Sequence, residues 1–161
     1  MIKSEHTLTV AEYDSIEGLN EADAWLLNEA RAATQFAYAP YSNFNVGAVA
    51  RLVNGEIVTG SNQENASYPA GICAERVLLS SATSQHPNVP IQTIAVSYNN
   101  MKGRSNTPIS PCGICRQSLA EYQQRTQNLI RIILGGMEGK IFVIDDAAQL
   151  LPLAFSSENL K

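Results

Sequence analysis

The 161-residue chain lacks the features that mark a membrane, secreted or nucleic-acid-binding protein. No apolar run approaches the roughly 20 residues of a membrane-spanning helix, so we expect no membrane insertion. Met1 to His6 are mostly polar and lead into no apolar signal-peptide core, which predicts a cytoplasmic protein. The 11 lysines and arginines are scattered, and the formal net charge is −4. Because a polynucleotide partner is expected to leave a basic stripe, the composition favours a small-molecule substrate and predicts no nucleic-acid partner.

Cysteine is also scarce, with three residues at positions 73, 112 and 115. Thiols stay reduced in the cytosol, and an odd count with two cysteines three positions apart argues against a disulfide framework. The pattern favours metal binding or catalysis instead. Histidine is limited to His6 and His86, and neither lies in a metal-ligand motif.

The length and composition fit a single domain with a sizeable core. Residues 1–20 are expected to form an extended N-terminal arm, with a short strand at 7–10. Residues 21–161 are expected to form one catalytic domain. No internal repeat or low-complexity segment interrupts it.

Helical and strand periodicities alternate along this domain. The expected helices cover residues 21–37, the segment after Cys73, 113–125 and a short turn after Asp145-Asp146; the expected strands cover 45–53, 56–60, 91–98, 129–134 and 140–144. The first two strands form a hairpin around Asn54-Gly55, and residues 99–110 form a loop. This order predicts an α/β fold, a three-layer α/β/α sandwich with a mixed sheet of about five strands.

Two short motifs contain all three cysteines: Cys73-Ala74-Glu75-Arg76 and Pro111-Cys112-Gly113-Ile114-Cys115-Arg116-Gln117. Three thiolates leave a tetrahedral Zn²⁺ one corner for water, whereas structural zinc sites are usually closed by a fourth protein ligand. Both motifs lie at expected helix starts, where backbone N–H groups and the helix dipole favour the thiolate form. The sequence therefore predicts a catalytic zinc site made by Cys73, Cys112 and Cys115.

A zinc ion with three thiolates carries a net negative charge, so neighbouring groups must withdraw charge from the ligands. Arg76 follows Glu75 directly and, with Arg116, could donate hydrogen bonds to thiolate sulfurs. Glu75, taken alone, is typical of an acidic residue in the first turn of a helix. Two residues after Cys73, it becomes a candidate general acid/base.

Other interpretations of the cysteines remain open. Cys112-Gly113-Ile114-Cys115 before a helix is also typical of a redox dithiol, but that interpretation leaves Cys73 and Glu75 without a role. A structural zinc site would need a fourth ligand that the two histidines do not obviously provide.

A cysteine followed two residues later by glutamate, and then by Pro-Cys-x-x-Cys, is the signature of zinc deaminases in its three-cysteine form. Beyond the cysteines, the chain carries the blocks Tyr41–Ala48, Gly60–Tyr68, Cys73–Arg76, Ser110–Gln117 and Leu150–Phe155. In this order they resemble the small, homotetrameric class of cytidine deaminases. The arm before Glu21 does not match the family pattern.

The resemblance implies hydrolytic deamination of cytidine and deoxycytidine to uridine and deoxyuridine in pyrimidine salvage, with one Zn²⁺ per subunit. Glu75 would move protons from the attacking water to the ring nitrogen and to the departing ammonia.

The resemblance also implies the substrate contacts. Asn62 and Glu64 would hydrogen-bond ribose hydroxyls, Phe44 would face the pyrimidine ring, and the main-chain carbonyl of Ala74 would accept from the substrate amino group. Phe155 would close the site of a neighbouring subunit, which makes a homotetramer with composite active sites. Each residue has an ordinary alternative, such as a turn Asn, an exposed Glu, a core Phe or a C-terminal apolar plug.

Gln117 ends the fourth block and is expected, with Arg76, to support the zinc ligands.

Two rival functions would use the same zinc site. One is deamination of a base within RNA or DNA or of a modified nucleoside antibiotic. The other is a catalytically silent, zinc-stabilised module that acts through oligomer contacts.

Overall fold

The computed structural model describes residues 1–161, with three α-helices and six β-strands joined by loops and short 3-10 helices. The strands are β1 (Ala11–Tyr13), β2 (Phe44–Leu52), β3 (Ile57–Ser61), β4 (Ile91–Asn100), β5 (Arg131–Gly135) and β6 (Ile141–Ile144), and the helices are α1 (Glu21–Ala33), α2 (Ala74–Gln85) and α3 (Gly113–Thr126).

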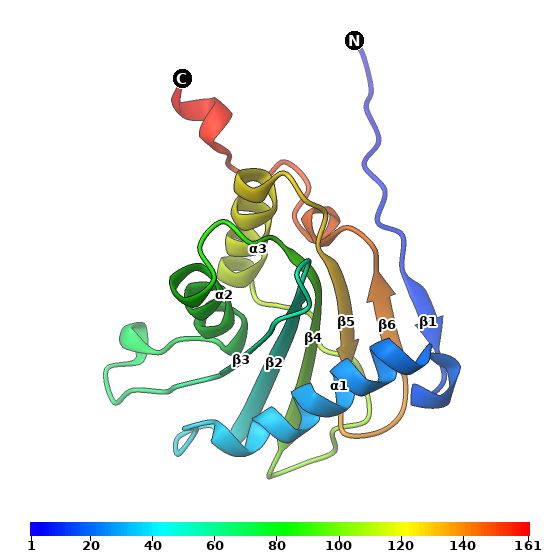
Figure 1. Ribbon diagram of the computed structural model, residues 1–161, viewed down its shortest axis with the longest axis vertical. Helices are drawn as coiled ribbons and strands as arrows, with labels where there is room; N and C mark the ends of the chain where they lie inside the picture. Colours follow the sequence, from blue (N-terminus) through cyan, green and yellow to red (C-terminus); the bar gives the residue numbers. More distant parts are fainter.

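The six strands form one mixed sheet in the order β1-β6-β5-β4-β2-β3 (Figure 1). Only β4 and β5 run parallel, and every other neighbouring pair is antiparallel. Helix α3 lies between β4 and β5 in the chain and supplies the crossover that a parallel pair requires.

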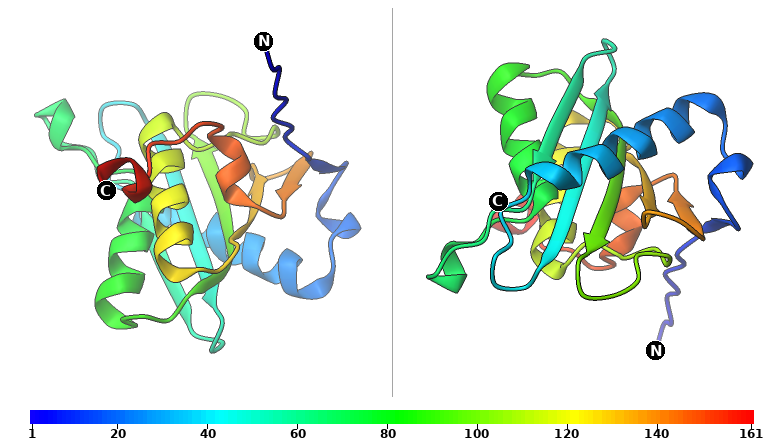
Figure 2. Two further views of the ribbon diagram at one scale, coloured as in Figure 1. Left: turned by 90° about the horizontal axis from the view of Figure 1, so that it is seen from above. Right: turned by 90° about the horizontal axis from the view of Figure 1, so that it is seen from below.

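Helices cover both faces of the sheet, as the predicted α/β/α sandwich requires (Figure 2). Helix α1 lies on one face over a cluster of nine buried apolar residues. Helices α2 and α3 lie on the other face over a cluster of 19. The larger core therefore lies on the side that carries both cysteine motifs. No helix has the length and apolar character needed to cross a membrane.

The sheet has six strands rather than the expected five because the N-terminal arm contributes β1 at its edge. The strand expected at 7–10 lies at Ala11–Tyr13 and pairs with β6. Val10 packs against the larger core and Tyr13 against the smaller one. The arm thus extends the sheet at its edge, while the residues before β1 extend away from the rest of the chain (Figure 1).

The hairpin predicted around Asn54-Gly55 is confirmed, with Gly55 at a φ of 89° that favours glycine. The first helix is shorter than predicted: α1 ends at Ala33 and a 3-10 helix, η2 (Thr34–Phe36), follows. Strand β4 runs two residues further than expected, because Asn99 and Asn100 pair with the start of β2. The turn expected after Asp145-Asp146 is a 3-10 helix, η4 (Ala147–Leu150).

Helix α2 lies unusually close to the edge strand β3. A Cβ atom on Gly60 would lie 2.5 Å from the Ala74 carbonyl oxygen and 2.6 Å from the Leu78 nitrogen. Only glycine allows this approach. It fixes the start of α2, and with it the first cysteine motif, against the sheet.

Candidate active site

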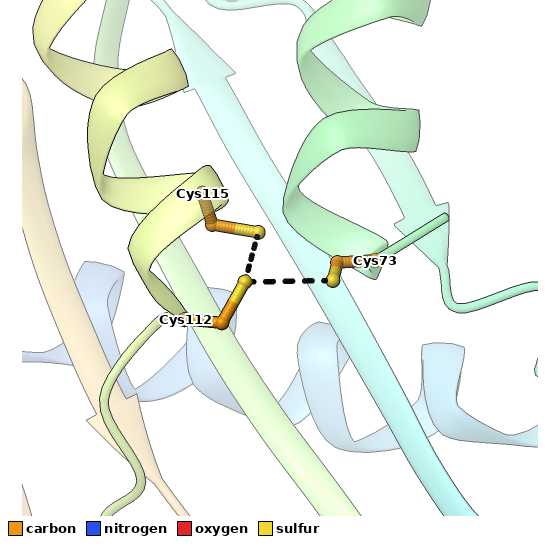
Figure 3. Close-up of side chains that lie close together, drawn as sticks. All are labelled: Cys73, Cys112 and Cys115. Carbon is orange, nitrogen blue, oxygen red and sulfur yellow. Dashed lines mark hydrogen bonds between the residues drawn. The ribbon is translucent and has the colours of Figure 1, made fainter. Parts of the chain in front are cut away.

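The cysteine motifs begin two neighbouring helices on the same face of the sheet. Cys73 is the N-cap of α2 and Cys112 the N-cap of α3, both with extended backbone, and Cys115 lies in the first turn of α3. The expected helix starts are therefore confirmed. Figure 3 shows the three side chains converging between the two helix ends.

The three sulfur atoms lie at distances that suit a single metal ion. Cys112 Sγ is 3.8 Å from Cys73 Sγ and 3.5 Å from Cys115 Sγ, and all three sulfurs lie within 4.8 Å of one another. A tetrahedral zinc ion with Zn–S bonds of about 2.3 Å separates its sulfurs by about 3.8 Å. Neither histidine belongs to the cluster. The thiols fit a zinc site with a free corner rather than a closed structural one.

The thiols are electrostatically coupled. The neighbouring Cys115 thiol, helped by the Cys112 thiol and the positive charge of Arg76, lowers the pKa of Cys73 to about 6. The nearby Cys73 thiol, together with burial, raises the pKa of Cys115 far above its usual value. Cys73 therefore ionises before Cys115. Metal binding displaces the protons that remain on the others.

Glu75 lies in the first turn of α2 and is only 5% exposed. Burial raises the pKa of its carboxyl group above the ordinary value, since desolvation disfavours the charged form. Interactions with its own backbone N–H and with the Cys115 thiol oppose this shift, and burial outweighs them. A buried carboxyl group with a raised pKa is suited to take up and release a proton near neutral pH.

A cavity of about 200 Å³ brings this chemistry together. Its walls are mainly apolar with a few polar groups: Val46, Asn62, Cys73, Ala74, Glu75, Val96, Ile109, Ser110, Pro111 and Cys112. Val46 and Val96 come from adjacent strands, and Ile109 to Pro111 from the loop before α3. Apolar walls that end at two thiols and a carboxyl group suit a flat heteroaromatic ring.

A larger cavity, about 440 Å³, lies between α2 and α3 and is not the candidate site, because it contains none of the cysteines and not Glu75. Arg76 lines this outer groove, and its guanidinium donates no hydrogen bond to a thiol sulfur. Its influence on Cys73 is through charge. Arg116 instead donates to the carbonyl oxygens of Pro111, at 2.8 Å, and Leu150, at 3.2 Å.

Asn62 and Glu64, the residues predicted to bind the sugar, form hydrogen bonds with backbone groups at and just before the start of β2. Asn62 Oδ1 accepts from the Val46 N–H at 2.7 Å, and Asn62 Nδ2 donates to the Phe44 carbonyl at 3.0 Å. Glu64 Oε2 accepts from the N–H groups of Tyr41, at 2.9 Å, and Ser42, at 3.3 Å. A hydrogen bond from the Ser42 side chain, with these backbone bonds, lowers the pKa of Glu64.

Not all predicted residues share the cysteine cavity. Asn62, Ala74 and Glu75 line it with two of the thiols, whereas Glu64 lines a separate pocket of about 360 Å³ with Tyr41 and Tyr68. Phe155 is 60% exposed in the C-terminal segment, where Gln117 Nε2 donates to its carbonyl oxygen at 2.7 Å. Within one chain, Phe155 is therefore not part of the cavity wall.

Several residues that line the cavity are not among the site residues predicted from the sequence. Val46 lies two positions after Phe44 on β2, so the strand's period of two places both on the same face. Val96 could have been found in the same way once β4 was known to pair with β2.

The geometry defines a class of protein, a zinc hydrolase of the deaminase type, in which a cluster of three thiols lies at a cavity that a buried carboxyl group also lines. Sequence comparison identifies the family. Residues 20–130 match the family described as "Cytidine and deoxycytidylate deaminase zinc-binding region", and the chain belongs to this family. One zinc ion per chain is accordingly its cofactor.

Proteins named cytidine deaminase are similar to this chain in sequence and in structure. It is 38% identical over 135 residues to cytidine deaminase from Halalkalibacterium halodurans, covering 84% of this chain and 95% of that protein. It is 36% identical over 135 residues to cytidine deaminase from Sporosarcina psychrophila, covering 84% and 92%. The crystal structure of cytidine deaminase from Burkholderia pseudomallei superposes with a TM-score of 0.72 at 38% identity, over 85% of this chain and 100% of that one.

Proposed function

We propose that this protein catalyses the hydrolytic deamination of cytidine and deoxycytidine to uridine and deoxyuridine, with release of ammonia. The observation that carries the proposal is the single cavity in which the buried Glu75 lies beside the thiols of Cys73 and Cys112. Relatives named cytidine deaminase, at 36–38% identity over most of their length, support the same reaction.

Cys73, Cys112 and Cys115 would hold the zinc ion, which when bound supplies Lewis-acid activation of a water molecule. Glu75 takes a proton from the attacking water and passes it to the ring nitrogen beside the reacting carbon. It then takes the second proton from the hydroxyl group that has added to this carbon and gives it to the amino group, which leaves as ammonia while the carbonyl of uridine forms. One water is consumed for each nucleoside, and Glu75 ends in its starting protonation state.

The remaining polar capacity of Asn62 and Glu64 supports their role in sugar binding. Asn62 uses one N–H and one oxygen lone pair in the strand contacts, and an amide has a second of each. Glu64 holds both backbone N–H groups with Oε2, so Oε1 can accept from a ribose hydroxyl. Phe44 would face the pyrimidine ring, and Ala74 would form the wall beside Glu75.

We further propose a homotetramer with composite sites. Phe155 is exposed, and Gln117 holds its backbone beside the start of α3. Tyr41 and Tyr68, which line the Glu64 pocket, are exposed as well. Assembly would bury these aromatic side chains, with Phe155 of one chain closing the site of the next. Because the zinc ligands must stay reduced, a cytoplasmic role in pyrimidine salvage is consistent with this chemistry.

The test is a spectrophotometric assay of the zinc-loaded protein with cytidine, deoxycytidine, CMP and cytosine, and with a cytidine-containing RNA oligonucleotide. We expect turnover of the two nucleosides and little of free cytosine, since cytosine leaves the polar groups for the sugar unpaired. Equal turnover of the oligonucleotide, or no turnover of either nucleoside, would reject the proposal.

The matched variant is Glu75→Gln, which keeps the shape of the side chain but cannot carry a proton. General acid/base catalysis contributes about 10²- to 10⁴-fold, so we expect a loss of at least that order in kcat with zinc content unchanged. Wild-type kcat in this variant would remove Glu75 from the mechanism.

A further inference from the structure

Two aromatic rings stack at the start of the strand that lines the candidate site. Phe44 opens β2, and its ring lies 4.9 Å from the ring of Tyr98 on β4, with an angle of 11° between the ring planes. Tyr98 is opposite Val46 in the strand register, and Phe44 is opposite Asn100. The two rings are therefore diagonal neighbours across adjacent strands, which lie side by side in Figure 1.

Both rings lie on the face of the sheet that lines the cavity. Phe44 and Val46 share one face of β2, and Val96 and Tyr98 share the same face of β4. Val46 and Val96 line the cavity, and Phe44 and Tyr98 come one step further along each strand. The stacked pair thus continues the apolar wall of the cavity.

The two rings differ in exposure. Neither ring is among the residues that line the cavity, but Tyr98 is only 3% exposed, whereas Phe44 is half-buried. Of the two rings, Phe44 is therefore the one that leaves part of its surface open to a ligand. Tyr98 supports Phe44 from behind.

Phe44 needs such support because the backbone before it is a turn. Asn43 has a φ of 58°, and the Phe44 N–H is bonded to Ser42 Oγ at 3.1 Å rather than to a neighbouring strand. A side chain at the end of a strand has several rotamers open to it unless packing removes them. The near-parallel Tyr98 ring holds Phe44 in one of them.

We propose that Tyr98 is a positioning residue for recognition of the nucleobase: it holds the Phe44 ring in the orientation that contacts the pyrimidine. This assignment rests on the proposed function. The aromatic ring of Tyr98, rather than its hydroxyl group, holds the Phe44 ring in this orientation. Its hydroxyl lies 3.5 Å from Thr107 Oγ1, which is long for a hydrogen bond and contributes little.

The assignment predicts a change in binding rather than in chemistry. Phe44 contacts the base in the ground state and in the transition state alike, and Glu75 and the thiols come from α2 and α3. Loss of such uniform binding raises KM and leaves kcat unchanged. A general loss of structure would instead lower kcat and zinc content together.

The experiment compares Tyr98→Leu and Tyr98→Phe with the wild type, all zinc-loaded. Tyr98→Leu removes the stacked ring, and we expect KM for cytidine to rise about three- to ten-fold, the range that a lost aromatic pair implies. We expect kcat within about two-fold of wild type, and the Kd for uridine, measured by calorimetry, to rise by the same factor as KM. Tyr98→Phe keeps the ring and should restore KM to within about two-fold of wild type, since only the long contact to Thr107 is lost.

The matched control is Tyr122→Phe. Like Tyr98, Tyr122 is a buried tyrosine, 5% exposed, but it lies in the larger core, and its hydroxyl donates to the Val89 carbonyl at 3.3 Å, outside the candidate site. We expect KM for cytidine to be unchanged. The unfolding midpoint of Tyr122→Phe shows how much the loss of a buried hydroxyl contact alone lowers the stability of the protein.

A double-mutant cycle shows whether Tyr98 acts through Phe44. If it does, Phe44→Leu with Tyr98→Leu should raise KM no more than Phe44→Leu alone. Independent, multiplying effects would overturn the assignment, and so would a wild-type KM in Tyr98→Leu. A wild-type protein that does not deaminate cytidine would be a different result, because it rejects the proposed function itself.

Discussion

Replacing Gly60 by alanine tests how closely α2 must approach the sheet for the site to form. The added Cβ atom would lie 2.5 Å from the Ala74 carbonyl oxygen and 2.6 Å from the Leu78 nitrogen. Ordinary contact begins near 3.4 Å, so the start of α2 must move by about 0.9 Å. Both close atoms belong to backbone, so no side-chain rotation relieves the clash.

That displacement should affect both activity and stability. It carries Cys73 and Glu75 away from Cys112, which is fixed on α3. A misplacement of about 1 Å can cost about 100-fold in rate, and overpacking of this kind costs about 1–3 kcal/mol in free energy of unfolding. We therefore expect kcat/KM for cytidine to fall by about 100-fold, with weaker zinc retention and a lower denaturant midpoint.

The matched control is Gly113→Ala. Gly113 is the first residue of α3, and a Cβ atom there meets nothing within 4 Å. Since alanine is the better helix former, this variant should be neutral or slightly more stable, with activity near wild type. Wild-type kinetics and stability in Gly60→Ala would refute the claim that close packing of α2 on β3 positions the site.

Two further variants test electrostatic features of the site and its surroundings. Arg76→Gln removes a positive charge that lowers the pKa of Cys73. In a competition titration with a chelator, the variant should lose its zinc at a lower chelator concentration than the wild type does. Identical titration curves would show that Arg76 does not support the zinc ligands. Glu64 has a lowered pKa in the folded protein, so its contribution to stability is complete above the ordinary glutamate pKa of about 4.3 and is lost as pH falls through the lowered value. The stability difference between wild type and Glu64→Gln should therefore shrink between pH 6 and acid pH. A difference that is constant with pH would contradict this role.

The features that the sequence predicts best are those set by local chemistry. Cysteine before a helical pattern, with proline before Cys112, indicates a helix start, and both cysteines are N-caps. Asn54-Gly55 defines a hairpin turn from two residues. In each case, neighbouring residues determine the conformation.

Features that depend on distant parts of the chain were not predictable. A short strand is expected in the arm at 7–10, but β1 lies at Ala11–Tyr13, because its position is set by pairing with the edge of β6, which no local pattern in the arm reveals. The orientation of Arg76 into the outer groove depends on how α2 packs beside α3. Tyr98 ended an expected strand and gave no sign of its contact with Phe44, because that contact depends on the register of β4 against β2.

The central claim is that one zinc ion, held by three thiolates beside Glu75, makes this protein a cytidine deaminase. The most direct measurement is a titration of zinc into metal-free, reduced protein, with ammonia release from cytidine followed at each step. The account predicts no activity without metal and a linear rise that ends at one zinc ion per chain. Activity that is independent of zinc, or none with one zinc ion bound per chain, would contradict it.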